Sequence, residues 1–107
     1  MATPPLRQMI AAVAEAVRPR RVVLFGSHAA GGAGEDSDVD LLVIEDGPLD
    51  EAGRADEMVR LWEALAPFRV PADILVYTEE EVAQWGATTN HAVAHALREG
   101  TVVYERP

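Results

Sequence analysis

Apolar residues recur along this chain with the two periods that distinguish helices from strands. In residues 6–17 they return every three or four positions, the spacing of one face of an amphipathic helix, and residues 58–65 repeat the pattern. Four other apolar runs are short and rich in β-branched residues, as buried strands are. These predicted strands are residues 22–25, 41–44, 70–77 and 101–104. The pattern therefore predicts a chain in which helices and strands alternate.

Two shorter helices are predicted between the third and fourth strands. Thr78 and Glu81 have the spacing of a capping box, which begins a helix that Gly86 ends. A last helix is expected over about residues 90–98, with Gly100 as its C-terminal cap.

The connections between the strands predict the fold class. The segment between the first two strands leaves room for about one helical turn, which is too little for an ordinary crossover between parallel neighbours. We therefore predict one domain over residues 1–107, of the α/β (α+β) class, with a mixed sheet of about four strands packed by helices. Pro71 cannot donate a ladder hydrogen bond, so the third strand begins at an edge or a strand end.

The segment between the first two strands carries the candidate chemistry. It opens with Gly26 and Ser27 and closes with Asp38, Val39 and Asp40. On an extended chain both carboxylates face one side, roughly 7 Å apart. Two like charges at that spacing repel unless a cation lies between them, and oxygen ligands suit a hard ion such as magnesium. Ser27 could otherwise serve only as a helix N-cap.

This spacing resembles the signature of the polymerase-β-like nucleotidyltransferase superfamily. Gly26 and Ser27, a spacer of ten residues and Asp38-x-Asp40 are each attached to an apolar strand, and the stretch looks like the minimal, MNT-type branch, which reads LFGSxARG and then SDxDLLV. The resemblance covers nearly all of the chain. It implies the nucleotidyltransferase fold, with ATP as substrate and a glycine-serine turn that holds the triphosphate.

The resemblance also implies a carboxylate triad and two Mg²⁺ ions. Asp73, which enters a strand otherwise read as Ile-Leu-Val, would complete the triad with Asp38 and Asp40. The other interpretation of Asp73 is a solvent-facing residue at the start of a strand. Ser37 would lie beside the metal site.

Two positions depart from the family pattern. The chain has His28 and Ala30 where the family usually has arginines that bind phosphate. A protonated His28 would supply part of the positive charge that the missing arginines provide in the family. Whether His28 touches the nucleotide stays open.

Several other residues have a functional and a structural interpretation. Arg20 and Arg21 fit either a phosphate contact or a solvated strand end, and Trp62 fits the core better than a nucleobase platform. His91 and His95 share a helical face, but no third ligand is evident, so packing or a partner surface is favoured over a metal site.

Composition limits the classes of partner and location. The formal charge is −9 and all nine basic residues are arginine, which disfavours direct nucleic-acid binding and excludes a phosphate-binding lysine. The absence of cysteine excludes disulfides and thiolate metal sites. There is no apolar run of membrane-spanning length, and the first residues are predicted to be helical, so we expect a cytoplasmic protein without a membrane partner.

Two functional hypotheses of different classes follow. In the first, the chain is an enzyme that moves AMP from ATP to a hydroxyl group. The resemblance implies that the acceptor is a tyrosine of a HEPN-type toxin, which the chain binds in a hetero-oligomer and neutralises as an antitoxin. In the second, the chain is a binding module that neutralises the HEPN partner by masking it. A third hypothesis, nucleotide addition to RNA, is disfavoured by the acidic charge.

Overall fold

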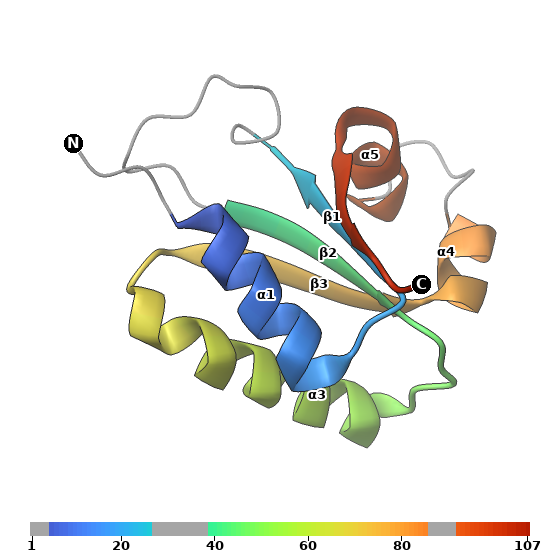
Figure 1. Ribbon diagram of the computed structural model, residues 1–107. Helices are drawn as coiled ribbons and strands as arrows, with labels where there is room; N and C mark the ends of the chain where they lie inside the picture. Colours follow the sequence, from blue (N-terminus) through green and yellow to red (C-terminus); the bar gives the residue numbers. More distant parts are fainter. Residues whose placement is uncertain (1–4, 27–38, 86–91) are drawn as a thin grey trace.

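The computed structural model describes residues 5–26, 39–85 and 92–107. The helices and strands follow one another as in the ribbon of Figure 1. They are α1 (Leu6–Val17), β1 (Arg21–Phe25), β2 (Val39–Glu45), α3 (Glu51–Leu65), a short 3₁₀ helix η1 (Ala66–Phe68), β3 (Ala72–Thr78), α4 (Glu79–Trp85), α5 (Ala92–Glu99) and β4 (Thr101–Glu105).

The four strands form one mixed sheet in the order β3-β2-β1-β4. Strand β1 is antiparallel to β2 and to β4, whereas β2 and β3 are parallel. The parallel pair is the one whose connection contains a full helix, α3, which returns the chain to the starting end of the sheet. The predicted mixed sheet of four strands is therefore confirmed.

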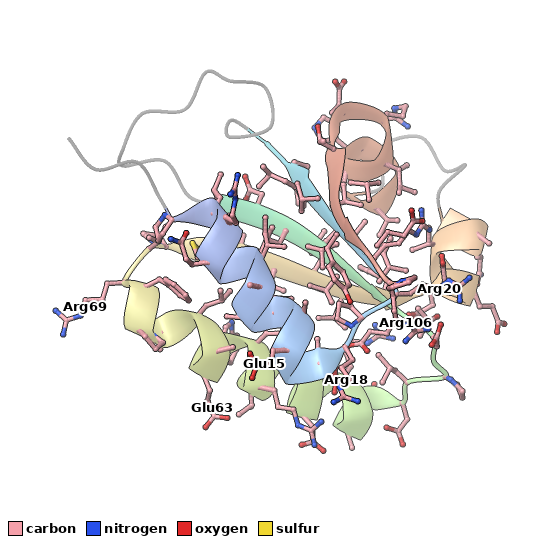
Figure 2. The ribbon with its side chains drawn as sticks, in the orientation of Figure 1. Glu15, Arg18, Arg20, Glu63, Arg69 and Arg106 are labelled. Atoms are coloured by element: carbon pink, nitrogen blue, oxygen red, sulfur yellow. The ribbon has the colours of Figure 1, made fainter. Side chains whose placement is uncertain are left out.

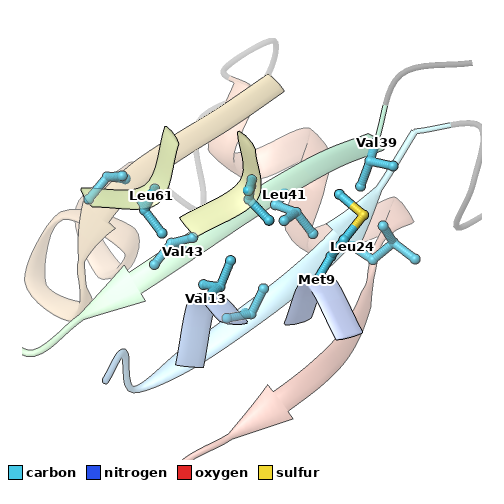
Figure 3. Packing of buried hydrophobic residues seen from close by; sticks show 10 residues of the cluster. Met9, Val13, Leu24, Val39, Leu41, Val43 and Leu61 are labelled. Carbon is cyan, nitrogen blue, oxygen red and sulfur yellow. The ribbon is translucent and has the colours of Figure 1, made fainter. Parts of the chain in front are cut away.

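Helices cover both faces of the sheet (Figure 1). Helices α1 and α3 pack on one face, where the side chains of Val39, Leu41 and Val43 from β2 lie in the larger core. Figure 3 shows this packing, with Met9 and Val13 of α1 over the central strands. We call it the α1–α3 face.

The opposite face is covered by α4 and α5, and we call it the α4–α5 face. Leu42 and Ile44 of β2 lie in a second, smaller core with Val82 of α4 and Val93 of α5. Because successive side chains of a strand point to opposite faces, the even-numbered residues of β2, which include Asp40, belong to the α4–α5 face.

Trp62 is a correction to the sequence analysis. It is 57% exposed, whereas Leu61 and Leu65 of the same helix are buried. A helix turns by about 100° per residue, so the residue that follows Leu61 points away from the core contact. The prediction that Trp62 lies in the core is wrong.

The predicted start of α4 is confirmed by its hydrogen bonds, whereas the glycine cap predicted for α5 is not formed. The amide of Glu81 donates to Thr78 Oγ1 at 3.1 Å, and the amide of Thr78 donates to Glu81 Oε1 at 2.9 Å, which is a capping box. At the end of α5 the amide of Gly100 donates to the Ala96 carbonyl at 2.8 Å, but Gly100 lacks the positive φ that defines a glycine cap. Gly86, the predicted end of α4, lies outside the described residues.

A pair of carboxyl groups lies between the sheet and α3. Glu45, the last residue of β2, is hydrogen-bonded to Glu57, and each has one buried Oε2 atom without a partner in the part of the chain that the structure describes. Burial raises the pKa of Glu45 to about 8, and the hydrogen bond to Glu57 and the charges of Glu57 and Asp46 act in the same direction. The charge of Arg60 opposes them.

We expect Glu45→Gln to stabilise the protein at pH 8. The pKa of this carboxyl is near 4.5 in the unfolded chain and about 8 in the folded one. Its contribution to stability is therefore present in full below pH 4.5 and is lost as the pH rises through 8. Glutamine keeps the hydrogen-bonding group and needs no proton. Thermal unfolding should show a higher melting temperature than the parent at pH 8 and little difference near pH 4.5.

Glu63→Gln is the matched control, because Glu63 is an exposed glutamate of α3, the helix that also carries Glu57 (Figure 2). It should leave the pH profile unchanged. Equal melting temperatures of Glu45→Gln and the parent at pH 8 would contradict the prediction.

Candidate functional site

Two of the predicted carboxylates lie side by side on neighbouring strands. Asp40 of β2 and Asp73 of β3 are register partners in the parallel pair. Partners on adjacent parallel strands are about 4.8 Å apart along the hydrogen-bonding direction, and their side chains point to the same face. Both carboxylates therefore belong to the α4–α5 face, at the end of the sheet where β2 and β3 begin.

Gly26 completes this end of the sheet. It follows β1 directly, and Phe25 is the register partner of Asp40 in the antiparallel pair. A Cβ atom placed on Gly26 would lie 2.1 Å from Oδ2 of Asp40, so the carboxylate of Asp40 rests where a side chain would otherwise be. Gly26 also has φ of +77°, a conformation that L side chains rarely adopt.

Glycine is thus required at position 26 for two independent reasons, space and backbone conformation. The sequence pattern predicts phosphate binding for Gly26 and gives no indication of its contact with Asp40. The signal that could have revealed it is the pairing of the end of β1 with the start of β2, and this depends on the register of the two strands.

The two carboxylates differ in exposure. Asp40 is half-buried, whereas Asp73 is exposed. Among the described residues no group of three or more His, Cys, Asp or Glu side chains is placed to hold a metal ion. Asp38, the third predicted ligand, lies outside the described residues, as do Ser27, His28 and Ser37.

The other sequence candidates lie away from this site or outside the described part. Arg21 pairs with Glu79 at 2.6 Å, and Arg20 pairs with Glu79 at 3.0 Å and with Asp46 at 3.4 Å. Arg21 is at the start of β1 and Gly26 follows its end, so these ion pairs agree with the strand-end interpretation. His95 is exposed, and His91 is not among the described residues.

One feature beside the site was missed by the sequence analysis. A shallow hollow of about 280 Å³ lies between the end of α3 and the start of β3. We call it the Trp62 hollow; it is lined by Trp62, Leu65, Ala66, Arg69, Val70, Pro71, Ala72 and Ile74. Ala72 and Ile74 are the sequence neighbours of Asp73, so the hollow lies against the same stretch of β3 but on the α1–α3 face, opposite the carboxylate of Asp73.

None of the helices among the described residues combines the length and apolar character needed to cross a membrane.

Comparison with protein families finds a nucleotidyltransferase domain model that matches residues 6–103. That match includes every strand residue of the site and all but nine residues of the chain. A search of curated protein sequences finds no match to this chain.

Solved structures share the fold at low sequence identity. A Sulfolobus solfataricus protein described as a candidate nucleotidyltransferase superposes with a TM-score of 0.63 at 22% identity, over 94% of this chain and 78% of that one. A chain of a toxin-antitoxin complex with AMP-PNP gives a TM-score of 0.61 at 18% identity, covering 95% and 74%. A chain from the complex of tri-AMPylated Shewanella oneidensis HEPN toxin with MNT antitoxin gives 0.52 at 16%, covering 94% and 69%.

Proposed function

Because the chain belongs to the nucleotidyltransferase domain family, we propose that it transfers AMP from ATP to a tyrosine hydroxyl of a HEPN-type toxin and so acts as its antitoxin. The observation that carries the proposal is the register of Asp40 with Asp73, which brings two carboxylates to one face of the sheet. Solved structures of the same fold include a toxin-antitoxin complex with an ATP analogue and one with an AMPylated HEPN toxin.

The described residues fit a magnesium site. Asp40 and Asp73 offer only oxygen ligands, and the missing Cβ of Gly26 leaves room for the carboxylate of Asp40. Together with Asp38 they would hold Mg²⁺, two ions in the family pattern. Magnesium bound there supplies positive charge against the charge of the transferring phosphoryl group.

The chain's own residues would bind the nucleotide and accept a proton. Gly26 and Ser27 are proposed to hold the triphosphate, with His28 and Ser37 beside it. The acceptor oxygen forms a bond to the α-phosphorus, while the bond from that phosphorus to the bridging oxygen breaks and pyrophosphate leaves. Asp73, the exposed carboxylate, is proposed to take the proton of the acceptor hydroxyl.

The partner is proposed to be a HEPN-type protein bound in a cytoplasmic hetero-oligomer. The formal charge of −9 favours association with a basic, RNA-cleaving protein over direct contact with RNA.

A second candidate function is masking without catalysis. The observation that favours it is the pair His28 and Ala30, which stand where the family usually has phosphate-binding arginines. In this case the chain neutralises the HEPN partner by covering it, and Asp38, Asp40 and Asp73 take no part in catalysis.

The two functions predict different masses for the partner. On co-expression with a helical protein of the neighbouring reading frame that has an Arg-x-x-x-x-His motif, the partner should gain about 329 Da for each AMP added, which is AMP less one water. The variant Asp38→Ala with Asp40→Ala should give no added mass. Intact-protein mass spectrometry makes the measurement.

Growth of the host distinguishes enzyme from mask. If the double variant still suppresses the partner's toxicity and still co-purifies with it, masking is the mechanism. Loss of protection together with loss of the added mass supports the transfer of AMP.

A further inference from the structure

Strand β3 is an edge of the sheet, and its outward backbone groups can be identified from its pairing. The amide of Val39 donates to the carbonyl of Pro71 at 2.9 Å, so the odd-numbered residues along β3 direct their backbone groups toward β2. The even-numbered residues direct theirs away from the sheet. These outward residues are Ala72, Ile74, Val76 and Thr78.

The second half of this edge is already covered. The guanidinium of Arg54, from α3, donates to the outward carbonyl of Val76 and pairs with Glu81 at 2.7 Å. It also lies 5.5 Å from the centre of the Tyr77 ring. Glu81 in turn accepts from the outward amide of Thr78. This network closes the edge against a further strand, in the manner by which many proteins protect exposed edges.

The first half of the edge has no such cover in the part of the chain that the structure describes. No side chain of the described residues is hydrogen-bonded to the outward groups of Ala72 and Ile74, which we call the open edge. Asp73 lies between these two residues, with its carboxylate on the α4–α5 face. Among the described residues, the stretch of β3 left open is therefore the one that carries the proposed catalytic carboxylate.

The open edge adjoins the Trp62 hollow. The walls of the hollow are mostly apolar, and Trp62 is more than half exposed above them. Arg69 stands at the rim, where Figure 2 shows its side chain extending away from the body of the protein. Arg69 makes no ion pair with any residue that the structure describes, in a chain of strongly acidic net charge. The hollow therefore suits an apolar side chain with an acidic group near it.

We propose that an extended segment of the acceptor protein adds to the open edge as a short strand and places its reacting hydroxyl at Asp73. This inference rests on the proposed function. Successive side chains of the added strand point to opposite faces, as they do in β3 itself. One side chain then reaches Asp73 on the α4–α5 face, and its immediate neighbour enters the Trp62 hollow on the α1–α3 face.

The geometry defines what the acceptor looks like. Its hydroxyl residue is directly next to a large apolar residue, and an acidic residue nearby pairs with Arg69. A second copy of this chain is a poorer occupant. Antiparallel self-pairing centred on the open edge would place Asp73 opposite Asp73 of the other copy, and like charges directly opposite one another destabilise a sheet.

Two substitutions test the proposal with the HEPN-type partner described above. Trp62→Ala removes the exposed wall of the hollow, and Ala72→Pro removes an outward amide that the ladder with β2 does not use. Each should weaken binding of the purified partner, and slow its gain of AMP, by about tenfold or more. Val59→Ala is the matched control, because Val59 is an exposed apolar residue of the same helix that does not line the hollow.

Hydrogen exchange separates strand addition from other docking. The amides of Ala72 and Ile74 should exchange rapidly in the free chain and become protected in the complex, while the amides of Asp73 and Leu75 are protected in both. Calorimetric titration of the free variants with ATP and Mg²⁺ should match the parent, which shows that the nucleotide site is intact.

The outcomes are distinct. If the parent modifies the partner and both variants do so equally well, the docking proposal is wrong and the proposed function stands. If the parent neither binds nor modifies the partner, the proposed function fails and this inference fails with it. If light scattering shows that the chain forms a dimer that Ala72→Pro dissociates, the occupant of the open edge is a second copy and the proposal is overturned.

Discussion

Replacing Asp40 by asparagine is expected to abolish nucleotidyl transfer and to leave the fold intact. The carboxylate of Asp40 packs against Gly26 on one side, and Asp40 is in register with Asp73 on the other side. Asp40 therefore lies at the centre of the proposed site. Asparagine has nearly the same shape but lacks the negative charge that would hold magnesium. The rate should fall by a factor on the order of 10² to 10³ or more, as for the loss of a principal charge-stabilising group.

The same substitution should not lower stability. Two carboxylates on neighbouring strands repel one another when no cation lies between them, and Asp40→Asn removes one of the two charges. The melting temperature of the free chain should therefore equal or exceed that of the parent. Asp46→Asn is the control, because Asp46 follows the last residue of β2, at the other end of that strand from Asp40. It forms ion pairs with Arg20 and Arg106, the two arginines that Figure 2 labels close to one another. This variant should transfer AMP at the parental rate.

Transfer rates are compared at saturating Mg²⁺ and ATP with the partner protein as acceptor. An Asp40→Asn rate within severalfold of the parent would remove Asp40 from the mechanism.

The second large effect is expected for Gly26→Ala. The new Cβ would lie 2.1 Å from Oδ2 of Asp40, well inside van der Waals contact, so the carboxylate must move. The positive φ of Gly26 adds backbone strain, which costs about 1–2 kcal/mol for a residue with a side chain. Transfer should fall by about a hundredfold or more, because a carboxylate displaced by an ångström would no longer be positioned to hold the proposed metal ion.

A glycine elsewhere separates lost stability from lost activity. A Cβ on Gly100 would lie 2.4 Å from the Ala96 carbonyl oxygen, 2.6 Å from Val23 Cγ1 and 2.8 Å from the Leu24 carbonyl oxygen, and none of these atoms belongs to either aspartate. Gly100→Ala should therefore destabilise the fold but keep the parental transfer rate per folded molecule at low temperature. If Gly26→Ala behaves as Gly100→Ala does, the contact between Gly26 and Asp40 has no part in the reaction.

Local features of the fold could be predicted from the sequence because they depend on neighbouring residues. The three- and four-residue spacing of apolar positions predicts α1 and α3, and the capping box at Thr78 and Glu81 predicts the start of α4. Pro71 predicts that the start of β3 lies at an edge or a strand end, and β3 is an edge strand. The short connection between the first two strands predicts an antiparallel step and hence a mixed sheet. Each of these predictions depends on the backbone geometry of residues that are close together in the sequence.

Side-chain direction around α3 was less predictable. Trp62 is large and apolar, and composition alone favours burial. Its neighbour Leu61 faces the core, so the helical rotation turns Trp62 outward to the hollow at the start of β3. The same choice between neighbouring apolar residues depends on which face the sheet presents to the helix, and that is a tertiary property.

The sequence by itself determined which residues carry the candidate chemistry, since Gly26, Asp40 and Asp73 each stand out against the apolar strands around them. Only the tertiary structure decided that these three meet. Runs of valine, leucine and isoleucine pair equally well in several registers, and a shift by one residue would move Asp73 to the opposite face of the sheet from Asp40. The packing of α1 and α3 on one face and of α4 and α5 on the other selects a single register, and in that register Asp40 lies between Gly26 and Asp73.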